Sequence, residues 1–466
     1  MVDTFMATGV LELALERRYD IVIVGSGVAG ATAAYLLSRM GFSVAIVDAK
    51  PSYRTGDKPC GDAIGKHHFE EVGIDPPRGD ELDGLVKGIM LYSPSEEVVL
   101  TIEGEGYEIN RVRFTQRLIR DSVDSGADYY DETNASAPII EGGFVRGVIA
   151  SRKGDKLVFR SNVVIDASGS ARSIVRRLPQ EWPIVDPIRP EDTQIAYREI
   201  RVLNEWIERP EYIRIYVNLK IAPGGYWWNF PKSIAKTVNV GLGVQGGKGY
   251  EHPRVYLYRY ILTRPEFRNS KLVESSGALV PTRRPPYTMV WNGVIVIGDA
   301  GYTVNPVHGG GKGSGMLSAK AAAIAYSKAA EQGDFSAKGL WVMNKLYIDY
   351  YGAKQASLDI FRIFLQRLSD DDIEYGLRRR IMRESDLYET SVTGVIKNKK
   401  GVFDKLSRVI AGLGRPSLLS KLILAAEYMD KMKKLYEEYP ETPEKLSEWI
   451  SRLNSLYNSF ERALST

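Results

Sequence analysis

The sequence has a single cysteine, Cys60, and only four histidines, at positions 67, 68, 252 and 308. One cysteine excludes an internal disulfide and a cysteine-cluster metal site, and the histidines do not have the spacing of zinc ligands. We therefore expect no metal cofactor.

The sequence also lacks an apolar run of the ~18 residues that cross a membrane. The segment before Tyr19 has neither the basic start nor the apolar centre of a secretion signal. The net charge of +4 is small for a nucleic-acid binder of 466 residues. These absences predict a cytoplasmic protein with no nucleic-acid partner.

What is present is a composition of ordinary globular type, with 44% hydrophobic and 26% charged residues. A chain of 466 residues is too long for one ordinary core, so we expect two or three domains.

The clearest motif lies between residues 19 and 50, where an apolar strand, a glycine-rich turn, a helix and a second strand follow one another. Gly25, Gly27 and Gly30 form the G-x-G-x-x-G turn, and Asp48 ends the second strand. Such glycines let a helix N-terminus approach a pyrophosphate, and the acid accepts the ribose hydroxyls of an adenosine. The pattern predicts a Rossmann-type dinucleotide site, and the alternative is a tight turn without a ligand.

Two later strands end in similar turns. The strand predicted at 156–166 runs into Asp166-Ala-Ser-Gly169, and the strand at 294–299 runs through a glycine-rich loop to Gly311, Lys312 and an alanine-rich helix. Ligands approach an α/β sheet at such strand ends. Because only the longer flavin dinucleotide needs a second glycine-rich junction, we expect FAD rather than NAD.

Segments 86–109 and 193–284 interrupt this unit. Apolar and polar residues alternate in them as they do in antiparallel strands. We therefore predict an α/β protein with a Rossmann-type FAD-binding domain, an inserted antiparallel β-sheet substrate domain and a C-terminal helical region. The expected boundaries are an N-terminal extension at 1–18, a discontinuous FAD-binding domain at 19–85, 110–192 and 285–369, a substrate-binding domain at 86–109 and 193–284, and a helical domain at 370–466. The extension could be a short amphipathic helix.

Two further features carry candidate chemistry. Cys60 lies in a glycine-rich loop at 58–65, where a free cysteine is as often a buried small hydrophobe as a reactive group. Tyr226, Trp228 and Phe230 alternate along a strand, so they share one face with Trp227 opposed. That face either lines an apolar pocket or packs on the sheet's own core.

As a set, the three glycine motifs resemble the FAD fingerprints of flavoproteins with the fold of para-hydroxybenzoate hydroxylase. Cys60-Gly61 in KPCGD, and PGGYWWNFPK at 223–232 followed by Gly241-Leu-Gly243, narrow the resemblance to the archaeal geranylgeranyl reductase family. The resemblance implies FAD-dependent saturation of isoprenoid double bonds, on geranylgeranyl diphosphate or on the geranylgeranyl chains of archaeal membrane-lipid precursors.

The same resemblance implies roles for individual residues. The FAD contacts would be Gly25, Gly27, Ala29, Gly30, Asp48, Cys60, Gly61, Ala63, Arg111, Ala135, Asp299, Gly311 and Lys312. Tyr226, Trp228, Phe230 and His308 would line the substrate pocket, and Cys60, Tyr226 and Trp228 would be catalytic.

The substrate's electronics predict the order of events. An isoprene double bond has no carbonyl to accept negative charge, so we expect the proton to arrive with or before the hydride. Aromatic faces would then stabilise the positive charge. Cys60 is the first candidate for the proton donor, and Tyr226, an ordered water and His308 are the others.

Other functions on the same fold stay open, namely a flavin-dependent monooxygenase or halogenase and a prenyl-binding escort protein without catalysis. The sequence shows no second nucleotide-binding unit, so the expected electron donor is a ferredoxin-like protein or another external reductant. Basic residues after residue 370 suggest a peripheral contact with a membrane; they are Arg378, Arg379, Arg380, Lys397, Lys399 and Lys400.

Overall fold

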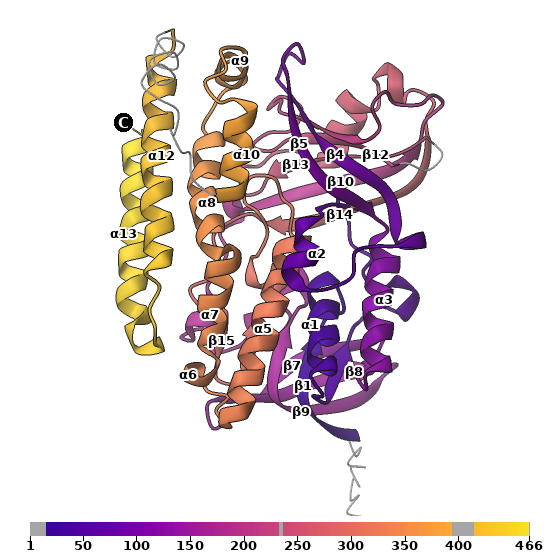
Figure 1. Cartoon of the computed structure of the whole chain (residues 1–466), viewed down its shortest axis with the longest axis vertical. Coiled ribbons are helices and arrows are strands. Elements are labelled where there is room, and N and C mark those ends of the chain that lie inside the picture. Colours follow the sequence, from indigo (N-terminus) through magenta and orange to yellow (C-terminus); the bar gives the residue numbers. More distant parts are fainter. Residues whose placement is uncertain (1–14, 233–235, 394–413, 466) are drawn as a thin grey trace, which may run out of the picture.

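The structure is a computed structural model that describes residues 15–232, 236–393 and 414–465. Its lower half in Figure 1 is built on a sheet of strand order β15-β16-β9-β1-β2-β6, which β8 and β7 extend from β9. The parallel strands are β1 (Leu15–Val24), β2 (Val44–Val47), β6 (Asp128–Tyr130), β9 (Asp155–Asp166) and β16 (Val294–Val296). The antiparallel ones are β7 (Thr133–Glu141), β8 (Phe144–Arg152) and β15 (Val290–Trp291).

The central strands are buried because they are short runs of apolar, mostly β-branched residues. All four residues of β2 and the last four of β1 are buried. Helices α5 (Lys312–Gln332), α1 (Val28–Arg39) and α3 (Arg111–Asp124) lie side by side over this sheet (Figure 1). Because β1 begins at Leu15, the last four residues of the expected N-terminal extension are strand; residues 1–14 lie outside the described part.

The upper half contains a second sheet, of strand order β14-β10-β13-β12-β11-β4-β5-β3 (Figure 1). Its strands are β3 (Ala63–Gly65), β4 (Leu82–Tyr92), β5 (Val99–Ile109), β10 (Thr193–Val202), β11 (Tyr212–Tyr216), β12 (Trp227–Pro231), β13 (Thr237–Gln245) and β14 (Lys271–Pro281). Neighbours are antiparallel except β4 and β11, which are parallel. These two strands come from separate segments of the chain, and the long connection through the first sheet permits the parallel direction.

The shorter helices of these two halves are α2 (His67–Val72) and α4 (Pro253–Tyr256). The C-terminal part is helical, as the sequence predicts, with α6 (Ala337–Leu340), α7 (Val342–Tyr347), α8 (Ala353–Leu365), α9 (Asp370–Arg378), α10 (Glu384–Thr393), α12 (Pro416–Glu437) and α13 (Leu446–Ser465). Helix α12 packs between α8 and α13, and α13 forms the outer layer in Figure 1. In the described ranges no helix is both long enough and apolar enough to cross a membrane.

A buried ion cluster ties these parts together. Asp186 lies 3.0 Å from the Nη2 of Arg283 and 2.7 Å from the Nη1 of Arg284. Arg283 and Arg284 follow strand β14, and the hydroxyl of Tyr436 on α12 lies 3.4 Å from the carbonyl oxygen of Pro285. Burial raises the pKa of Asp186, but Arg284 and then Arg283 outweigh it and hold the pKa below its usual range.

Candidate active site

Two glycines of the first turn, Gly25 and Gly30, leave no space for a side chain. Gly25 has φ +103°, and a Cβ there would lie 2.5 Å from the carbonyl oxygen of Ala167. A Cβ on Gly30 would lie 1.9 Å from the carbonyl oxygen of Gly25. The turn after β1 therefore packs directly on the turn after β9. It leaves the N-terminus of α1 free to approach a dinucleotide at the ends of the parallel strands.

Asp48 closes the adenosine end of this cradle. Its Oδ2 accepts hydrogen bonds from the N–H of Ser26 at 2.6 Å and from the Ser26 hydroxyl at 2.7 Å. The carboxylate is thus fixed beside the glycine turn, and its contact with a ribose stays a prediction from the motif. Ala135, on β7, is buried, with 6% of its surface exposed.

The second glycine junction faces the first. A Cβ on Gly298 would lie 2.9 Å from the Cβ of Ala29, and one on Gly311 would lie 3.3 Å from the Oδ1 of Asp299. Gly311 is the N-cap of α5, so the N-termini of α1 and α5 converge here. Asp299 forms an ion pair with Lys58 from the loop that carries Cys60.

Arg111 adds an unused donor to this region. Its side chain is 9% exposed and lies 3.5 Å from the Oδ1 of Asp62. Its Nε is buried without a hydrogen-bond partner in the described structure. A buried guanidinium with an unpartnered donor, on which the charge of Asp299 acts, is suited to an anionic group of a cofactor.

Cys60 is fixed between the two sheets. The Nζ of Lys312, the first residue of α5, lies 3.3 Å from its Sγ. The Nδ2 of Asn239 on β13 donates to the backbone carbonyl of Cys60 at 2.6 Å, and the Oδ1 of Asn239 accepts from the indole N–H of Trp228 at 3.0 Å. A single side-chain amide thus joins the cysteine loop to the aromatic strand.

The aromatic strand β12 places its alternate residues as its sequence predicts. Trp228 and Phe230 pack with Tyr226 and with apolar residues of β4 and β11. Trp227 lies in a different cluster and stacks on Tyr216 with ring centroids 3.6 Å apart. The Tyr226, Trp228 and Phe230 side chains form one apolar surface, which we call the aromatic wall.

Gly61 and His308 bring the other motifs to the aromatic wall. A Cβ on Gly61 would lie 2.4 Å from Cε2 of Phe230, so the cysteine loop packs on the wall without space for a side chain. The hydroxyl of Tyr226 donates to the backbone carbonyl of His308 in the glycine-rich loop before α5. Ala63 of β3 also packs against the wall.

The charges around Cys60 favour its thiolate. Burial raises the pKa of Cys60, but Lys312 and then Arg111 act in the opposite direction, and the net effect lowers the pKa below its ordinary value. Burial, together with the charge of Cys60, raises the pKa of Tyr226. The side chain of His308 is exposed, and the surrounding protein and then Lys354 lower its pKa.

Two residues near this site escape prediction from the sequence. Asn239 lies in a run of small and apolar residues, and nothing in that run marks its two hydrogen bonds. Glu108 occupies a polar position of an alternating strand, which normally indicates the solvent face. In the structure Glu108 is 1% exposed.

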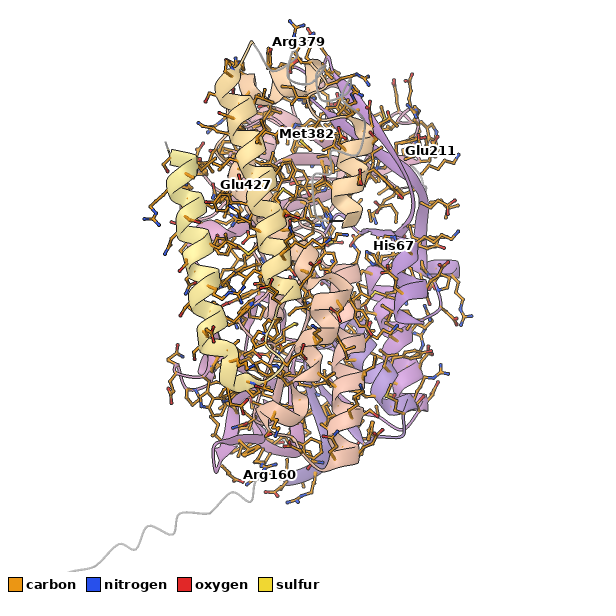
Figure 2. The ribbon with its side chains drawn as sticks, turned by 60° about the vertical axis from the view of Figure 1, so that its left-hand side comes forward. His67, Arg160, Glu211, Arg379, Met382 and Glu427 are labelled. Carbon is orange, nitrogen blue, oxygen red and sulfur yellow. The ribbon has the colours of Figure 1, made fainter. Side chains whose placement is uncertain are left out.

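A further polar cluster lies beside the start of α5. Ligand atoms of His67, His68 and Glu71 lie within 4.8 Å of one another, although the spacing in sequence does not suggest a metal site. Figure 2 labels His67 in the middle of the molecule's height. Burial lowers the pKa of His67, and the charges of His68 and Lys354 lower it further. A cationic side chain, Lys354, therefore already acts on this cluster.

Two families of known proteins match separate parts of the chain. Residues 192–280, which contain the aromatic wall, match the family described as the geranylgeranyl reductase catalytic domain. Residues 20–57 match the family of FAD dependent oxidoreductases.

Comparisons with individual proteins extend over nearly the whole chain. It is 50% identical over 456 residues to digeranylgeranylglycerophospholipid reductase of Sulfolobus acidocaldarius, covering 97% of this chain and 100% of the relative. The protein of that name from Methanoculleus marisnigri is 30% identical, with 82% of this chain and 95% of the relative covered.

Solved structures share the fold. A geranylgeranyl bacteriochlorophyll reductase-like protein from Thermoplasma acidophilum superimposes with a TM-score of 0.74 at 23% identity, covering 88% of this chain and 100% of that chain. A flavin-dependent brominase superimposes with a TM-score of 0.61 at 18% identity, covering 85% of this chain and 94% of that chain.

Proposed function

The chain belongs to the digeranylgeranylglycerophospholipid reductase family of FAD-dependent oxidoreductases, and from this premise we propose that it saturates the isoprenoid double bonds of geranylgeranyl glycerophospholipids. One observation carries the proposal. The aromatic wall and the Cys60-Gly61 loop are in contact at the start of α5, where the cofactor cradle ends. An apolar wall next to a cofactor site suits a hydrocarbon chain.

When bound and reduced, FAD supplies a hydride to the alkene. The chain's own residues position the substrate and deliver the proton. Cys60 is the proposed proton donor, and Lys312 stabilises the thiolate that remains. Tyr226 is a weaker candidate, because its pKa is raised and its hydroxyl is bonded to the carbonyl of His308. His308 is also a weaker candidate, because its lowered pKa leaves little of the cationic acid at pH 7.

The aromatic wall has a second proposed role, in the stabilisation of charge. Protonation on the less substituted carbon develops positive charge on the more substituted one. The faces of Tyr226, Trp228 and Phe230 attract such a charge, by about 2 kcal/mol for a desolvated contact, or roughly thirtyfold in rate.

We place the phosphate headgroup of the lipid at the cluster of His67 and His68, beside Lys354. Burial lowers the pKa of Lys354 to about 8, and a phosphate beside it would keep it charged. Glu71 alone among these side chains would repel the headgroup; its Oε2 lies 3.2 Å from the Nδ1 of His68. A phosphate would displace this contact.

Contact with a membrane surface is proposed for the end of the molecule that carries α9. Figure 2 shows Arg379 at this end and Arg160 at the opposite one. Arg378 already pairs with Glu97 and Glu374, so it contributes little positive field. Lys397, Lys399 and Lys400 lie outside the described residues. The electrons come, in this proposal, from an external reductant such as a ferredoxin-like protein.

The test uses the purified full chain. We expect a yellow protein that, reduced by dithionite without oxygen, adds hydrogen to digeranylgeranylglycerophospholipid as followed by mass spectrometry. A halogenase would instead need oxygen and halide and would act on an electron-rich aromatic compound. A protein that is reoxidised by oxygen but leaves the lipid unsaturated would contradict the proposal.

A further inference from the structure

Glu108 on β5 is a buried acid whose carboxyl group has no hydrogen-bond partner in the described structure. It is 1% exposed, and both of its carboxylate oxygens are buried without a hydrogen-bond partner. An ionised carboxylate in such a place carries a large desolvation penalty, whereas a protonated one carries a much smaller penalty. Burial accordingly raises the pKa of Glu108 well above its ordinary value, against a smaller opposing effect of Lys232.

The strand register places Glu108 on the face that carries the aromatic wall. Glu108 is opposite Ala63 of β3, and Ala63 packs against the wall. Its sequence neighbours Tyr107 and Ile109 point the other way, into the core of the first sheet. Ala63 is three positions after Cys60 in the chain, so the carboxyl group of Glu108 faces the end of the cysteine loop.

Four ionisable side chains act electrostatically on Glu108. The charges that act on it belong to Lys232 on β12, Asp62 and Cys60 in the cysteine loop, and Lys312 on α5. The Nζ of Lys232 lies 2.6 Å from Asp83 and 4.0 Å from Asp62.

A partly open cavity of about 290 Å³ lies beside two of these side chains. Asp62, Asp83, Lys232 and Arg111 line it, together with Ile109, the residue after Glu108. The Oδ1 of Asp62 is buried and accepts no hydrogen bond in the described structure. Asp62 and Lys232 therefore border this cavity, whereas Glu108, which is 1% exposed, does not line it. Cys60 is half-buried.

We propose that Glu108 is the internal proton store that reprotonates Cys60 after each double bond is reduced. This inference rests on the proposed function. Cys60 loses its S–H proton to the alkene carbon. The neutral carboxyl of Glu108 then passes its O–H proton to the thiolate through an intervening water, because no protein group lies within hydrogen-bond distance of its oxygens in the described structure. The Glu108 carboxylate recovers a proton from water in the cavity, by way of Asp62 and Lys232. No electrons move in this series, and the hydride comes from the reduced flavin of the established cofactor.

The first test needs no catalysis. Infrared difference spectra between wild type and Glu108→Gln, in the FAD-loaded protein at pH 7, should contain a protonated-carboxyl band that shifts in deuterated water. Glu105→Gln is the matched control, because Glu105 is on the same strand with 77% of its side chain exposed. Absence of the band in wild type would show an ionised Glu108 and overturn the proposal.

The second test separates the first turnover from later ones. With prereduced flavin, and with the enzyme first equilibrated at an acidic pH at which Cys60 carries its proton, Glu108→Gln should reduce the first double bond at the wild-type rate. Later turnovers should slow by about 100-fold, the usual scale of a lost acid–base group. Glu108→Asp, which keeps a proton, should recover part of this loss.

Other outcomes contradict the relay and leave the proposed function intact. Unchanged steady-state turnover in Glu108→Gln, or an equal slowing of the first and later turnovers, would show that Glu108 does not recharge Cys60. If Glu108→Gln does not fold, two measurements still test the relay. They are the wild-type infrared band and the ratio of first to later turnover rates in Glu108→Asp. Failure of the wild type to reduce the lipid at all would instead contradict the proposed function.

Discussion

The ammonium nitrogen of Lys312 lies 3.3 Å from the sulfur of Cys60, a residue 252 positions earlier in the chain. The contact joins the start of α5 to the loop that packs on the aromatic wall. A cation at this distance favours the thiolate over the thiol. The sole cysteine of the chain is thus placed to release a proton at the point where the cofactor cradle and the wall meet.

Replacement of Lys312 by Met should raise the pKa of Cys60, because the cation that stabilises the thiolate is removed. We expect less thiolate at neutral pH than in the wild type. The rate of iodoacetamide alkylation against pH measures it without ambiguity, since the chain has one cysteine. Lys328→Met, an exposed position on the same helix, is the control. An unchanged alkylation profile in Lys312→Met would show that the contact has no electrostatic effect.

Replacement of Cys60 by Ser should leave FAD bound and slow turnover by roughly 100-fold, because a serine hydroxyl is a much weaker acid. Flavin absorbance and lipid mass spectra measure the two quantities. In a single turnover, wild-type enzyme with flavin reduced in protiated buffer is mixed rapidly into deuterated water, before the flavin N5 hydrogen exchanges. This reaction should place solvent deuterium on the less substituted carbon of the double bond. Full activity of the serine variant would exclude Cys60 as the proton donor. Deuterium on the more substituted carbon would exclude protonation of the less substituted one.

Replacement of Trp228 by Leu should slow the reduction about thirtyfold with FAD retained, if the indole face stabilises developing positive charge. Trp228→Phe should lose less, because it keeps an aromatic face but not the N–H bond to Asn239. The exposed Trp206 supplies a control, Trp206→Leu. Single-turnover rates with prereduced enzyme are the measurement. Equal rates for wild type and Trp228→Leu would leave the wall a packing surface only.

Replacement of Gly61 by Ala should destabilise the protein by about 1–3 kcal/mol, the usual cost of overpacking. The new Cβ would lie 2.4 Å from Phe230, so the loop and the aromatic wall must separate. Adding Phe230→Leu should recover part of the thermal stability. Gly104→Ala on β5 is the control, because a Cβ there meets nothing within 4 Å. Additive effects of Gly61→Ala and Phe230→Leu would show that the two residues are not in contact.

Replacement of Asp186 by Asn should cost about 3–5 kcal/mol, because two buried arginines lose their partner. The pH dependence should change as well. The folded-state pKa of Asp186 is depressed, so its contribution is complete above the unfolded value near 4 and is lost as the pH falls through the folded value. Thermal unfolding between pH 6 and about pH 2 should therefore show a steeper acid loss for wild type than for Asp186→Asn. The exposed Asp371→Asn should match wild type in both respects.

The fold could be predicted because its signals are local. Short apolar strands, glycine turns and Asp48 lie within 32 residues of sequence, and alternation alone separates Trp227 from the aromatic wall. The contacts between the two sheets could not be predicted in this way. The bonds of Asn239 to Cys60 and Trp228 join segments up to 179 residues apart.

Glu108 shows a different limit of sequence patterns. Alternation correctly separates it from Tyr107 and Ile109, but it cannot say what covers the other face of the strand. That face meets the cysteine loop rather than solvent, and this depends on how β3 adds to the edge of the second sheet. A polar residue at such a position is therefore assigned to the surface when only the sequence is available.

The amide of Asn239 makes the occupancy of the two ligand sites interdependent. Because it holds both the indole of Trp228 and the backbone of Cys60, a lipid that immobilises the wall also immobilises the loop beside the flavin. Thermodynamic linkage requires the reverse effect to be equal in size. A tightly held lipid should therefore retard the loss of FAD, and the enzyme should exchange its cofactor most readily when no substrate is present.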